Sequence, residues 1–318
     1  MNPIPVILDT DPGVDDALAL MLALRSPELD VLGICTVSGN VPVAVGTCNA
    51  LKVLGLLKRL NVPVYQGADK PLKRDPVYAT AVHGEDGLGG AVLPNPEIKA
   101  TDGAVDFLIE TISARPHEIT LIAVGPLTNL ALAEQHMPGI LKKTKRIIVM
   151  GGAISEPGNV TPTAEFNFFA DPHAAQIVVR SGAVLILVPL DVTHRVGLTE
   201  PVIDNRILPL GTPEAKFVVE ATQKLLALGE KSGRHRVVFL HDPMAVAMAI
   251  DAAMFQTVIL PIDVETEGVL TLGQVVVDRR ACVLGGKHKG YSTGCAMGVN
   301  KDVLLHLFLS RILNLTDG

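Results

Sequence analysis

Short apolar runs alternate with segments of helical periodicity over the first 190 residues of the chain. The runs are rich in Val and Ile and contain few polar residues, as is typical of strands that are buried on both faces. They predict strands at Val6–Leu8, Val31–Val37, Val62–Tyr65, Ile119–Val124, Arg146–Met150 and Val184–Pro189. The segments between them predict helices at Asp15–Leu24, Val43–Leu60, Ala104–Ala114, Leu127–Gln135 and Pro172–Ser181. This alternation favours a largely parallel sheet that is covered by helices.

The pattern changes in the last third of the chain. A long amphipathic segment predicts a helix at Pro213–Lys231, and a shorter helix is predicted at Pro243–Ile250. Strands are then predicted at Val258–Glu265, Val269–Leu272 and Gln274–Asp278, before a closing helix at Asp302–Leu313. No linker rich in Pro, Gly or Ser divides the chain, so we predict a single domain over residues 1–318. The predicted fold class is α/β, with an open, mostly parallel, Rossmann-like sheet, helices on both faces and a C-terminal β-containing elaboration.

The composition is that of a protein with a large aliphatic core. The chain has 318 residues, of which 48% are hydrophobic and 19% charged, and it contains no Trp, three Tyr and eight Phe. A formal net charge of −6 and the lack of a basic stripe argue against a nucleic-acid partner. No apolar stretch approaches the roughly 18 residues of a membrane span, and we expect no signal peptide and no membrane partner. The four cysteines, Cys35, Cys48, Cys282 and Cys295, lack zinc-ligand spacing and predict reduced thiols in a cytoplasmic protein.

Four aspartates follow the first predicted strand within eight residues: Asp9, Asp11, Asp15 and Asp16. Like charges this close together are unfavourable unless a cation or a shared proton relieves them. Carboxylates are hard oxygen ligands, which favours Ca²⁺ or Mg²⁺ over zinc. Helix capping would account for one or two of the four aspartates, so the cluster predicts a cation site.

Further polar residues follow the other predicted strands. Because ligands bind beyond the carboxyl ends of the strands in an open parallel sheet, these segments are expected to meet at one edge. They are rich in carboxylates, amides and hydroxyls and poor in thiols and basic residues, which indicates a cation site beside a sugar or polyol site. The segments are Asp9–Asp16, Ser38–Asn40, Gly125–Asn129, Gly151–Asn167 and Asp191–His194.

Several common motifs are absent from the sequence. The glycine-rich segment Gly84–Gly90 does not match a dinucleotide-binding loop, and no phosphate-binding Gly-Lys-Ser/Thr or serine-nucleophile motif occurs. Asp171 precedes Pro172 in a plain helix start and is expected to serve only as a helix cap. Asp242 also precedes a proline, but His241 beside it makes this pair a candidate site.

The motifs together resemble those of the inosine–uridine-preferring nucleoside hydrolases. The resemblance begins with Asp9-Thr-Asp-Pro-Gly-Val-Asp-Asp16 and extends, in order, over roughly three quarters of the chain. It includes Ser38-Gly-Asn40, His83-Gly-Glu-Asp-Gly-Leu-Gly-Gly90, Gly125-Pro-Leu-Thr-Asn129, Met150-Gly-Gly152, Glu165-Phe-Asn167 and His241-Asp-Pro243. The resemblance implies Ca²⁺-dependent hydrolysis of ribonucleosides to ribose and free base. It also implies direct attack of a metal-held water that an aspartate activates, and a homodimer or homotetramer.

The same resemblance implies roles for individual residues. Asp11, Asp16 and Asp242 match calcium-binding carboxylates, and Thr128 matches a position that offers its backbone carbonyl to the metal. Asp15 matches the general base, and His241 matches a histidine that protonates the leaving base. His83 stands where the family has another active-site histidine, and the ribose-binding set is matched by Asn40, Asn159, Glu165 and Asn167.

Recognition of the base is not settled by the sequence. Family members often stack the base against aromatic side chains, whereas Gly229–Arg236 contains no Phe, Tyr or Trp. Two alternatives remain for this segment. One of its basic residues contacts the base, namely Arg234, His235 or Arg236, or the whole segment is a solvated loop. We favour the solvated loop. The alternatives to nucleoside hydrolysis are a non-catalytic protein that binds nucleosides or ribose, and a hydrolase of a related N-riboside.

Overall fold

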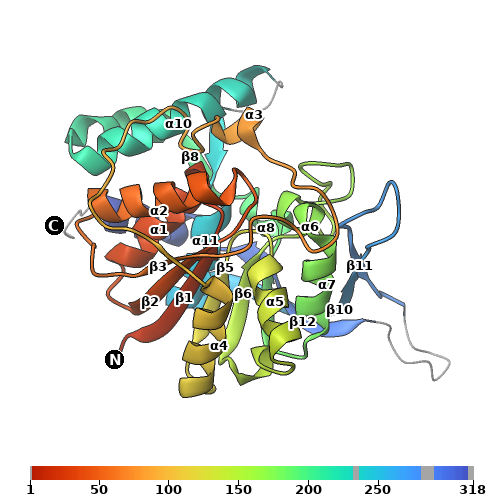
Figure 1. Ribbon diagram of the computed structural model, residues 1–318. Helices are drawn as coiled ribbons and strands as arrows, with labels where there is room; N and C mark the ends of the chain where they lie inside the picture. The colour runs from red at the N-terminus through yellow and green to blue at the C-terminus, as the bar shows by residue number, and fades with distance from the viewer. Residues whose placement is uncertain (1, 232–235, 281–289, 314–318) are drawn as a thin grey trace.

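One ten-stranded sheet runs through the protein, in the order β11-β10-β12-β7-β6-β5-β1-β2-β3-β4 (Figure 1). A computed structural model describes residues 2–231, 236–280 and 290–313. Eight neighbouring strands, in the order β12-β7-β6-β5-β1-β2-β3-β4, are parallel to one another. At the other end of the sheet, β10 pairs antiparallel with both β12 and β11. The strands are β1 (Ile4–Thr10), β2 (Leu29–Thr36), β3 (Val64–Gln66), β4 (Thr101–Asp102), β5 (Thr120–Ala123), β6 (Arg146–Met150), β7 (Leu185–Val188), β10 (Phe255–Val264), β11 (Val275–Val277) and β12 (Tyr291–Val299). A separate hairpin pairs β8 (Gly197–Thr199) with β9 (Val237–Phe239).

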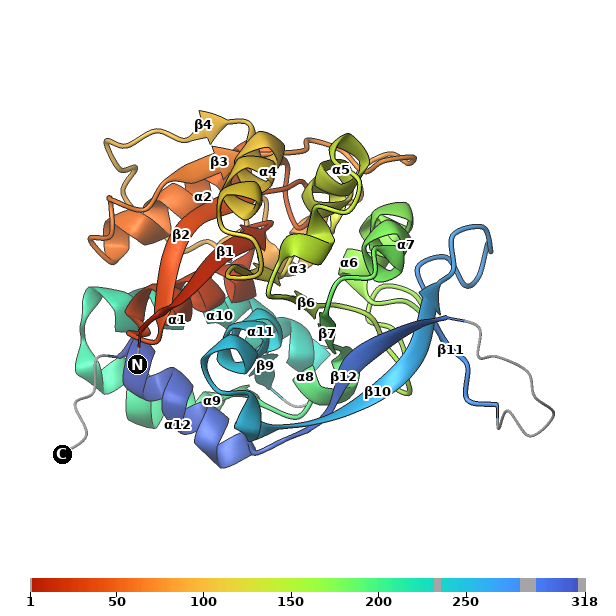
Figure 2. The ribbon, with the colours of Figure 1, turned by 90° about the horizontal axis from the view of Figure 1, so that it is seen from below.

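Helices cover both faces of the sheet, as the sequence predicts (Figure 2). One face packs against α1 (Val14–Arg25), α2 (Val43–Leu56) and α11 (His241–Ile250), and α12 (Lys301–Ile312) packs on α1 and α11. The other face packs against α4 (Ala104–Ala114), α5 (Thr128–His136) and α7 (Pro172–Arg180). The remaining helices are α3 (Thr80–His83), α6 (Phe166–Ala170), α8 (Leu190–Thr193), α9 (Glu200–Val202) and α10 (Pro213–Lys231). The α/β class and the mostly parallel sheet are therefore confirmed.

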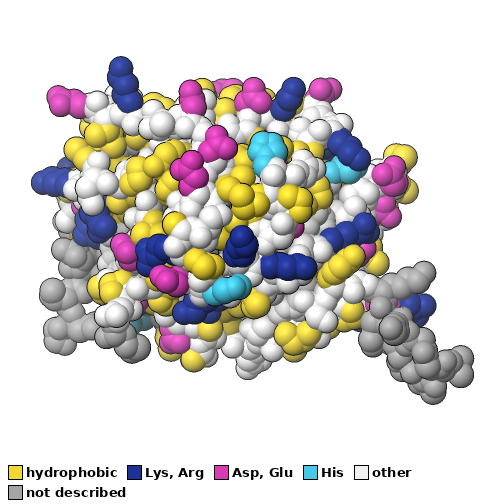
Figure 3. Space-filling view, turned by 60° about the horizontal axis from the view of Figure 1, so that its bottom comes forward, with side chains coloured by type: hydrophobic (Ala, Val, Ile, Leu, Met, Phe, Trp, Pro, Cys, Tyr) yellow, Lys and Arg dark blue, Asp and Glu magenta, His cyan; other side chains and the backbone are white. Residues whose placement is uncertain are grey.

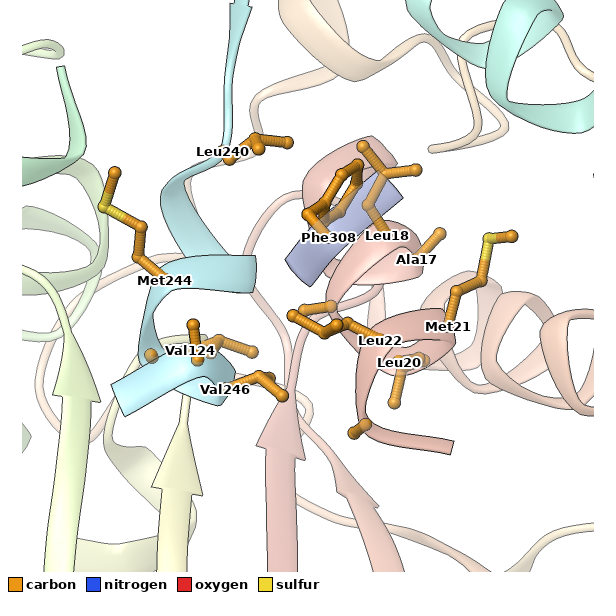
Figure 4. Close-up of a cluster of buried hydrophobic side chains, with 14 of the residues drawn as sticks. Ala17, Leu18, Leu20, Met21, Leu22, Val124, Leu240, Met244, Val246 and Phe308 are labelled. Carbon is orange, nitrogen blue, oxygen red and sulfur yellow. The ribbon is translucent and has the colours of Figure 1, made fainter. Parts of the chain in front are cut away.

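The core on the first face is formed mainly by α1 and α11 (Figure 4). Helix α1 is apolar on almost every side after its first turn, and all residues from Ala17 to Leu24 are buried. A helix of this kind is expected between a sheet and other helices. Phe308 of α12 and Met244 of α11 are both fully buried in this cluster. The packing fixes the start of α1, which is where the aspartate cluster lies.

The register of the sheet aligns the carboxyl ends of its central strands. Leu8 of β1 pairs with Ile122 of β5, which pairs with Ile148 of β6. Ile148 in turn pairs with Ile186 of β7. Strands that are paired in this way end at the same edge, so the polar segments that follow β1, β5, β6 and β7 are brought together.

Two features of the C-terminal region differ from the sequence prediction. The predicted strand Val269–Leu272 is a turn, which is spanned by a hydrogen bond of 2.8 Å from the backbone N–H of Gly273 to the carbonyl oxygen of Glu265. Val269 and Leu270 are 96% and 82% exposed, so their apolar character does not report burial. Strand β12 was not predicted, although it lies inside the sheet between β7 and β10.

The surface carries charged residues of both signs. Figure 3 shows Lys and Arg side chains together with Asp and Glu side chains among hydrophobic ones on one face. None of the helices in the described parts of the chain has the length and apolar character needed to cross a bilayer. Arg234, His235 and Cys282, which the sequence analysis named, lie outside the described residues.

Candidate active site

The aspartate cluster lies at the junction of β1 and α1. Asp16 is fully buried and accepts four hydrogen bonds, from Thr10 Oγ1 at 2.5 Å, Asp11 N at 3.1 Å, Gly13 N at 2.9 Å and Asn40 Nδ2 at 2.9 Å. These bonds close the turn between strand and helix and attach Asn40 to it. Asp16 therefore organises the junction.

A second segment, after β2, approaches the cluster through Asn40. Its backbone N–H donates to Asp11 Oδ2 at 2.6 Å, while its side chain donates to Asp16. The preceding residue must be Gly39, because a Cβ atom there would lie 1.9 Å from Asp11 Oδ2. The strand ends of β1 and β2 are thus joined through direct hydrogen bonds to two carboxylates.

Asp242 completes the acidic group from a distant part of the chain. It lies in the first turn of α11, and its carboxylate falls within 4.8 Å of those of Asp15 and Asp16. Asp11 is outside this set of three, although its charge acts on Asp242. The Oδ1 atoms of Asp11 and Asp15 are buried and have no hydrogen-bond partner among the described residues.

The pKa values of these carboxyl groups reflect burial and mutual repulsion. Burial, followed by the charge of Asp16, raises the pKa of Asp15 from 3.8 to about 8. Burial and the neighbouring carboxylates also raise the pKa values of Asp11 and Asp242 well above the usual range. Negative charge at this place is therefore costly without a compensating cation. Buried carboxylate oxygens that lack partners suit a hard divalent cation such as Ca²⁺ or Mg²⁺.

Amide and carboxylate groups from the segment after β6 face the cluster. Glu165 caps α6 and accepts hydrogen bonds from Asn167 N at 2.8 Å, Gly152 N at 2.9 Å and Phe168 N at 3.2 Å. Burial raises the pKa of Glu165 to about 6, even though these N–H groups oppose the shift. Asn167 donates through Nδ2 to the carbonyl oxygen of Val124 at 2.8 Å. Asn159 is exposed, and its Oδ1 accepts from Phe166 N at 2.9 Å.

Two histidines line the cavity. His83 ends α3 and accepts a hydrogen bond at Nδ1 from the Val14 N–H at 3.2 Å, while the same atom lies 3.8 Å from Asp15 Oδ1. Burial lowers the pKa of His83 to about 4. His241 begins α11, and its Nδ1 lies 2.7 Å from Thr193 Oγ1. Burial, together with the nearby imidazoles of His194 and His83, lowers the pKa of His241 to about 3.

A cavity of about 350 Å³ lies between these groups. The cavity wall includes eight of the eleven residues predicted from the sequence: Asp15, Asn40, His83, Asn159, Glu165, Asn167, His241 and Asp242. Asp11 and Asp16 are fully buried behind this wall, and Thr128 is buried at the start of α5. The hydroxyl of Thr128 donates a hydrogen bond to the Asp171 carboxylate at 2.8 Å.

The apolar side of the cavity was not foreseen from the sequence. Tyr78, Phe166 and Phe239 contribute aromatic surface there, together with Val82 and Leu225. Aromatic surface therefore borders the cavity although Gly229–Arg236 contains no Phe, Tyr or Trp. These residues come from the loop before α3, from α3 itself, from α6, from β9 and from α10, and all except Phe166 lie outside the motifs found in the sequence. Phe166, which lies inside Glu165-Phe-Asn167, is the one residue for which the sequence carried a signal.

Two other aspartates support the site from behind. Asp9 Oδ2 accepts from Asn129 Nδ2 at 2.8 Å, and burial raises the pKa of Asp9 to about 7. Asp171 caps α7 as predicted, but it also accepts hydrogen bonds from Thr128 Oγ1 and from Leu72 N, each at 2.8 Å. The prediction that Asp171 serves only as a helix cap is therefore wrong, because Asp171 also fixes the start of α5.

Known proteins match the chain over nearly its full length. A family model described as inosine-uridine preferring nucleoside hydrolase matches residues 6–306. The pyrimidine-specific ribonucleoside hydrolase RihA of Salmonella arizonae is 43% identical over 278 residues, which cover 86% of this chain and 88% of that protein.

Two solved structures are similar in fold and sequence. The plant nucleoside hydrolase PpNRh1 superposes with a TM-score of 0.92 and 33% identity, covering 98% of this chain and 100% of that one. A purine-preferring ribonucleoside hydrolase from Gardnerella vaginalis gives a TM-score of 0.90 and 34% identity, covering 98% of each chain. One relative is thus named for pyrimidines and one structural neighbour for purines.

Proposed function

This chain belongs to the inosine-uridine preferring nucleoside hydrolase family, and from that membership we propose a Ca²⁺-dependent hydrolase that cleaves ribonucleosides by direct attack of water. Asp15 carries this proposal. Its carboxylate lies within 4.8 Å of Asp16 and Asp242 on one side and lines the cavity on the other. An aspartate in that position can take a proton from water next to a bound sugar.

The acidic group fits a hard cation because two buried carboxylate oxygens, Oδ1 of Asp11 and Oδ1 of Asp15, lack hydrogen-bond partners within residues 2–231, 236–280 and 290–313. Asp11, Asp16 and Asp242 would hold Ca²⁺, together with the backbone carbonyl of Thr128. When bound, the ion supplies positive charge and oxygen coordination at this edge of the sheet. A cation would also relieve the repulsion that raises the pKa values of Asp11, Asp15 and Asp242.

The remaining polar groups are proposed to bind the ribose. Asn40 and Glu165 both line the cavity and are less than one tenth exposed, so a sugar hydroxyl there meets groups that are already oriented. Asn167 lies on the same side, and Asn159 reaches the cavity rim. Such amide and carboxylate groups donate to and accept from ribose hydroxyls, which fixes the anomeric carbon relative to Asp15.

The bond changes in the proposed reaction are as follows. Water forms a bond to the anomeric carbon and gives a proton to Asp15, while the C–N bond breaks and its electron pair moves to the base. The base lies against Tyr78, Phe166 and Phe239, whose rings supply stacking surface. His241 is proposed to stabilise the departing base, and His83 to contact the substrate. No carboxylate nucleophile is needed, so the configuration at the anomeric carbon inverts.

Ribose release from inosine, uridine, cytidine and adenosine would test this function directly. Each nucleoside is first assayed with added Ca²⁺. A second assay contains an excess of chelator, and Ca²⁺ is then added to it in an amount that exceeds the chelator. We expect release that the chelator abolishes and that Ca²⁺ restores better than Mg²⁺. Unchanged release in chelator would contradict the metal requirement.

Calorimetry and assays on other N-ribosides separate the alternative functions. Nucleoside binding by calorimetry without any product would favour a binding protein, and faster turnover of a nicotinamide riboside or a modified nucleoside would favour a related N-riboside. Deoxyinosine is a further control. It lacks the 2′-hydroxyl, so the polar groups proposed to bind that hydroxyl are left without a partner, which is costly.

The organisation of the protein is part of the same proposal. A single domain over residues 1–318 is supported by one sheet whose strands come from both ends of the chain. Assembly as a homodimer or homotetramer and a cytoplasmic location stay predictions. Sedimentation of the purified protein would give the oligomeric state.

A further inference from the structure

Thr193 lies behind His241 and is outside the resemblance on which the proposed function rests. It is the last residue of the short helix α8, and it is fully buried. Its Oγ1 lies 2.7 Å from Nδ1 of His241, which is 48 residues further along the chain. Thr193 does not line the cavity, whereas His241 does. Any effect of Thr193 on a bound substrate must therefore pass through the imidazole.

The direction of this hydrogen bond follows from the acceptors that are available. A buried hydroxyl has one proton to donate, and leaving it unpaired costs free energy. Among the described residues, His241 Nδ1 is the one atom with which Thr193 Oγ1 makes a hydrogen bond, and this hydroxyl makes none to the backbone carbonyls before it. Buried threonines elsewhere do make such bonds, as Thr47 does to Val43 and Thr222 to Val218. The proton of Thr193 therefore points at Nδ1.

An imidazole that accepts at Nδ1 carries its proton on Nε2. The ring is held in place by its neighbours, since its centroid lies 5.5 Å from that of His194 and 5.8 Å from that of Phe239. Nε2 is the ring nitrogen that Thr193 does not engage, and the His241 side chain belongs to a residue that lines the cavity, whereas Thr193 does not. An N–H donor is thus directed at the place where the departing base would lie.

We propose that Thr193 is a positioning residue that holds His241 in the tautomer with an Nε2–H, so that this group donates a hydrogen bond to the base as the C–N bond breaks. The inference rests on the proposed hydrolysis. The electron pair of the C–N bond moves onto the base, the Nε2–H bond stays intact, and the base takes its proton from solvent after release. Without the threonine proton, the ring can adopt the other tautomer, which presents a lone pair to the base.

The test compares Thr193→Val, which keeps the shape and removes the hydroxyl, with Thr193→Ser, which keeps the hydroxyl. Each variant is assayed on a good nucleoside substrate and on p-nitrophenyl riboside, whose leaving group is a stable anion that needs little help from a donor. For Thr193→Val we expect kcat on the nucleoside to fall about tenfold with little change in KM, the factor expected for one lost hydrogen bond. The loss on p-nitrophenyl riboside should be at least several-fold smaller, and Thr193→Ser should restore most of the nucleoside rate.

Thr120→Val is the matched control. Thr120 is also a fully buried threonine, but its hydroxyl has no hydrogen-bond partner in the described parts of the chain, and it lies at the start of β5, outside the cavity wall. We expect this variant to match the parent on both substrates. Equal losses on both substrates for Thr193→Val, or no loss on the nucleoside, would overturn the inference. If the parent protein hydrolyses neither substrate, it is the proposed function that fails.

Two further measurements separate positioning from general disruption. The double variant Thr193→Val with His241→Ala should be no slower on the nucleoside than His241→Ala alone, because the threonine acts through that ring. Nitrogen chemical shifts of labelled histidine should assign the proton of His241 to Nε2 in the parent and show a shift toward Nδ1 in Thr193→Val. Additive losses in the double variant, or a proton on Nδ1 in the parent, would contradict the proposal.

Discussion

Asp15 and Asp16 are neighbours in the chain and yet have opposite environments. Successive residues of a helix point about 100° apart, so the first turn of α1 directs one carboxylate into the strand–helix junction and the other toward the cavity. Asp16 accepts four hydrogen bonds, whereas Asp15 Oδ1 accepts none. A carboxylate held by several donors is suited to structure and cation binding, and one with a free oxygen is suited to take a proton.

Replacing Asp15 by Asn should therefore remove catalysis with little effect on the fold. We expect kcat to fall by about 10²–10⁴, the contribution of general-base catalysis, while KM changes much less. Ribose release measures the effect, and Asp30→Asn, an exposed site on β2, is the matched acid-to-amide control. Turnover of Asp15→Asn within a few-fold of the parent would exclude Asp15 as the base.

At the scale of elements, α3 and α10 lie side by side (Figure 1). Helix α3 carries Val82 and His83, and α10 carries Leu225, all of which line the cavity. The Lys224 ammonium donates to the backbone carbonyl of Thr80 at 3.0 Å, which ties the two helices together. A four-residue helix has little stability of its own, so its position depends on this tie and on apolar contacts.

Replacing Lys224 by Met should loosen α3 without touching the acidic cluster. We expect KM for a nucleoside to rise about two- to fivefold, as one hydrogen bond from a partly exposed charge is lost, with a smaller change in kcat. Lys216→Met, an exposed site on the same helix, is the control and should behave as the parent. An unchanged KM for Lys224→Met would show that apolar contacts alone place α3.

Helix α12 packs against α1 and α11, and its Phe308 belongs to the same buried cluster (Figure 4). Phe308 is 1% exposed there, whereas Val303 on the same helix is 47% exposed. Phe308→Ala should lower the free energy of unfolding by about 3–5 kcal/mol, through lost burial and the cavity left behind. Val303→Ala should change it by no more than about 0.5 kcal/mol in denaturant titrations. Similar losses in the two variants would contradict this packing.

At the scale of the whole molecule, the sheet gathers negative charge at one buried place. Burial raises the pKa of Asp9 to about 7, and burial with the charge of Asp16 raises the pKa of Asp15 to about 8, from 3.8 for each. At pH values between 3.8 and the raised pKa values of about 7 and about 8, these carboxyl groups hold more protons in the metal-free folded protein than in the unfolded chain. The protein's free energy of unfolding therefore decreases as pH rises through this window.

We expect the Tm of the chelator-treated protein to fall between about pH 5 and about pH 8, and added Ca²⁺ to raise Tm most at the upper end of this range. Ligand that binds the folded state stabilises it, and deprotonated carboxylates bind the cation best. Thermal unfolding at matched ionic strength measures both effects, with Na⁺ as the control cation. A Tm that is insensitive to Ca²⁺ at every pH would contradict a cation site in the acidic cluster.

The predicted elements were confirmed where a segment carries its own pattern. Strand β6 and the helices α4 and α10 have the predicted bounds, because strand and helix periodicity depend on nearby residues alone. Strand β12 was missed because its small residues Gly294, Cys295 and Ala296 show no alternation of apolar and polar side chains. Their extended conformation depends instead on pairing with β7 and β10. The opposite error occurred at Val269–Leu272, where an apolar run is exposed.

By itself, the sequence determined the alternation of strands and helices over most of the first 190 residues, the acidic cluster after β1 and the polar motifs after the other strands. These features are local, because spacing along one segment is enough to encode them. Only the tertiary structure decided which side chains share the cavity. Asp242 joins Asp15, Tyr78 and Phe239 form an apolar wall, and Thr193 contacts His241. Such contacts join residues that are far apart in the chain, and they arise from sheet register and helix packing, which no local pattern records.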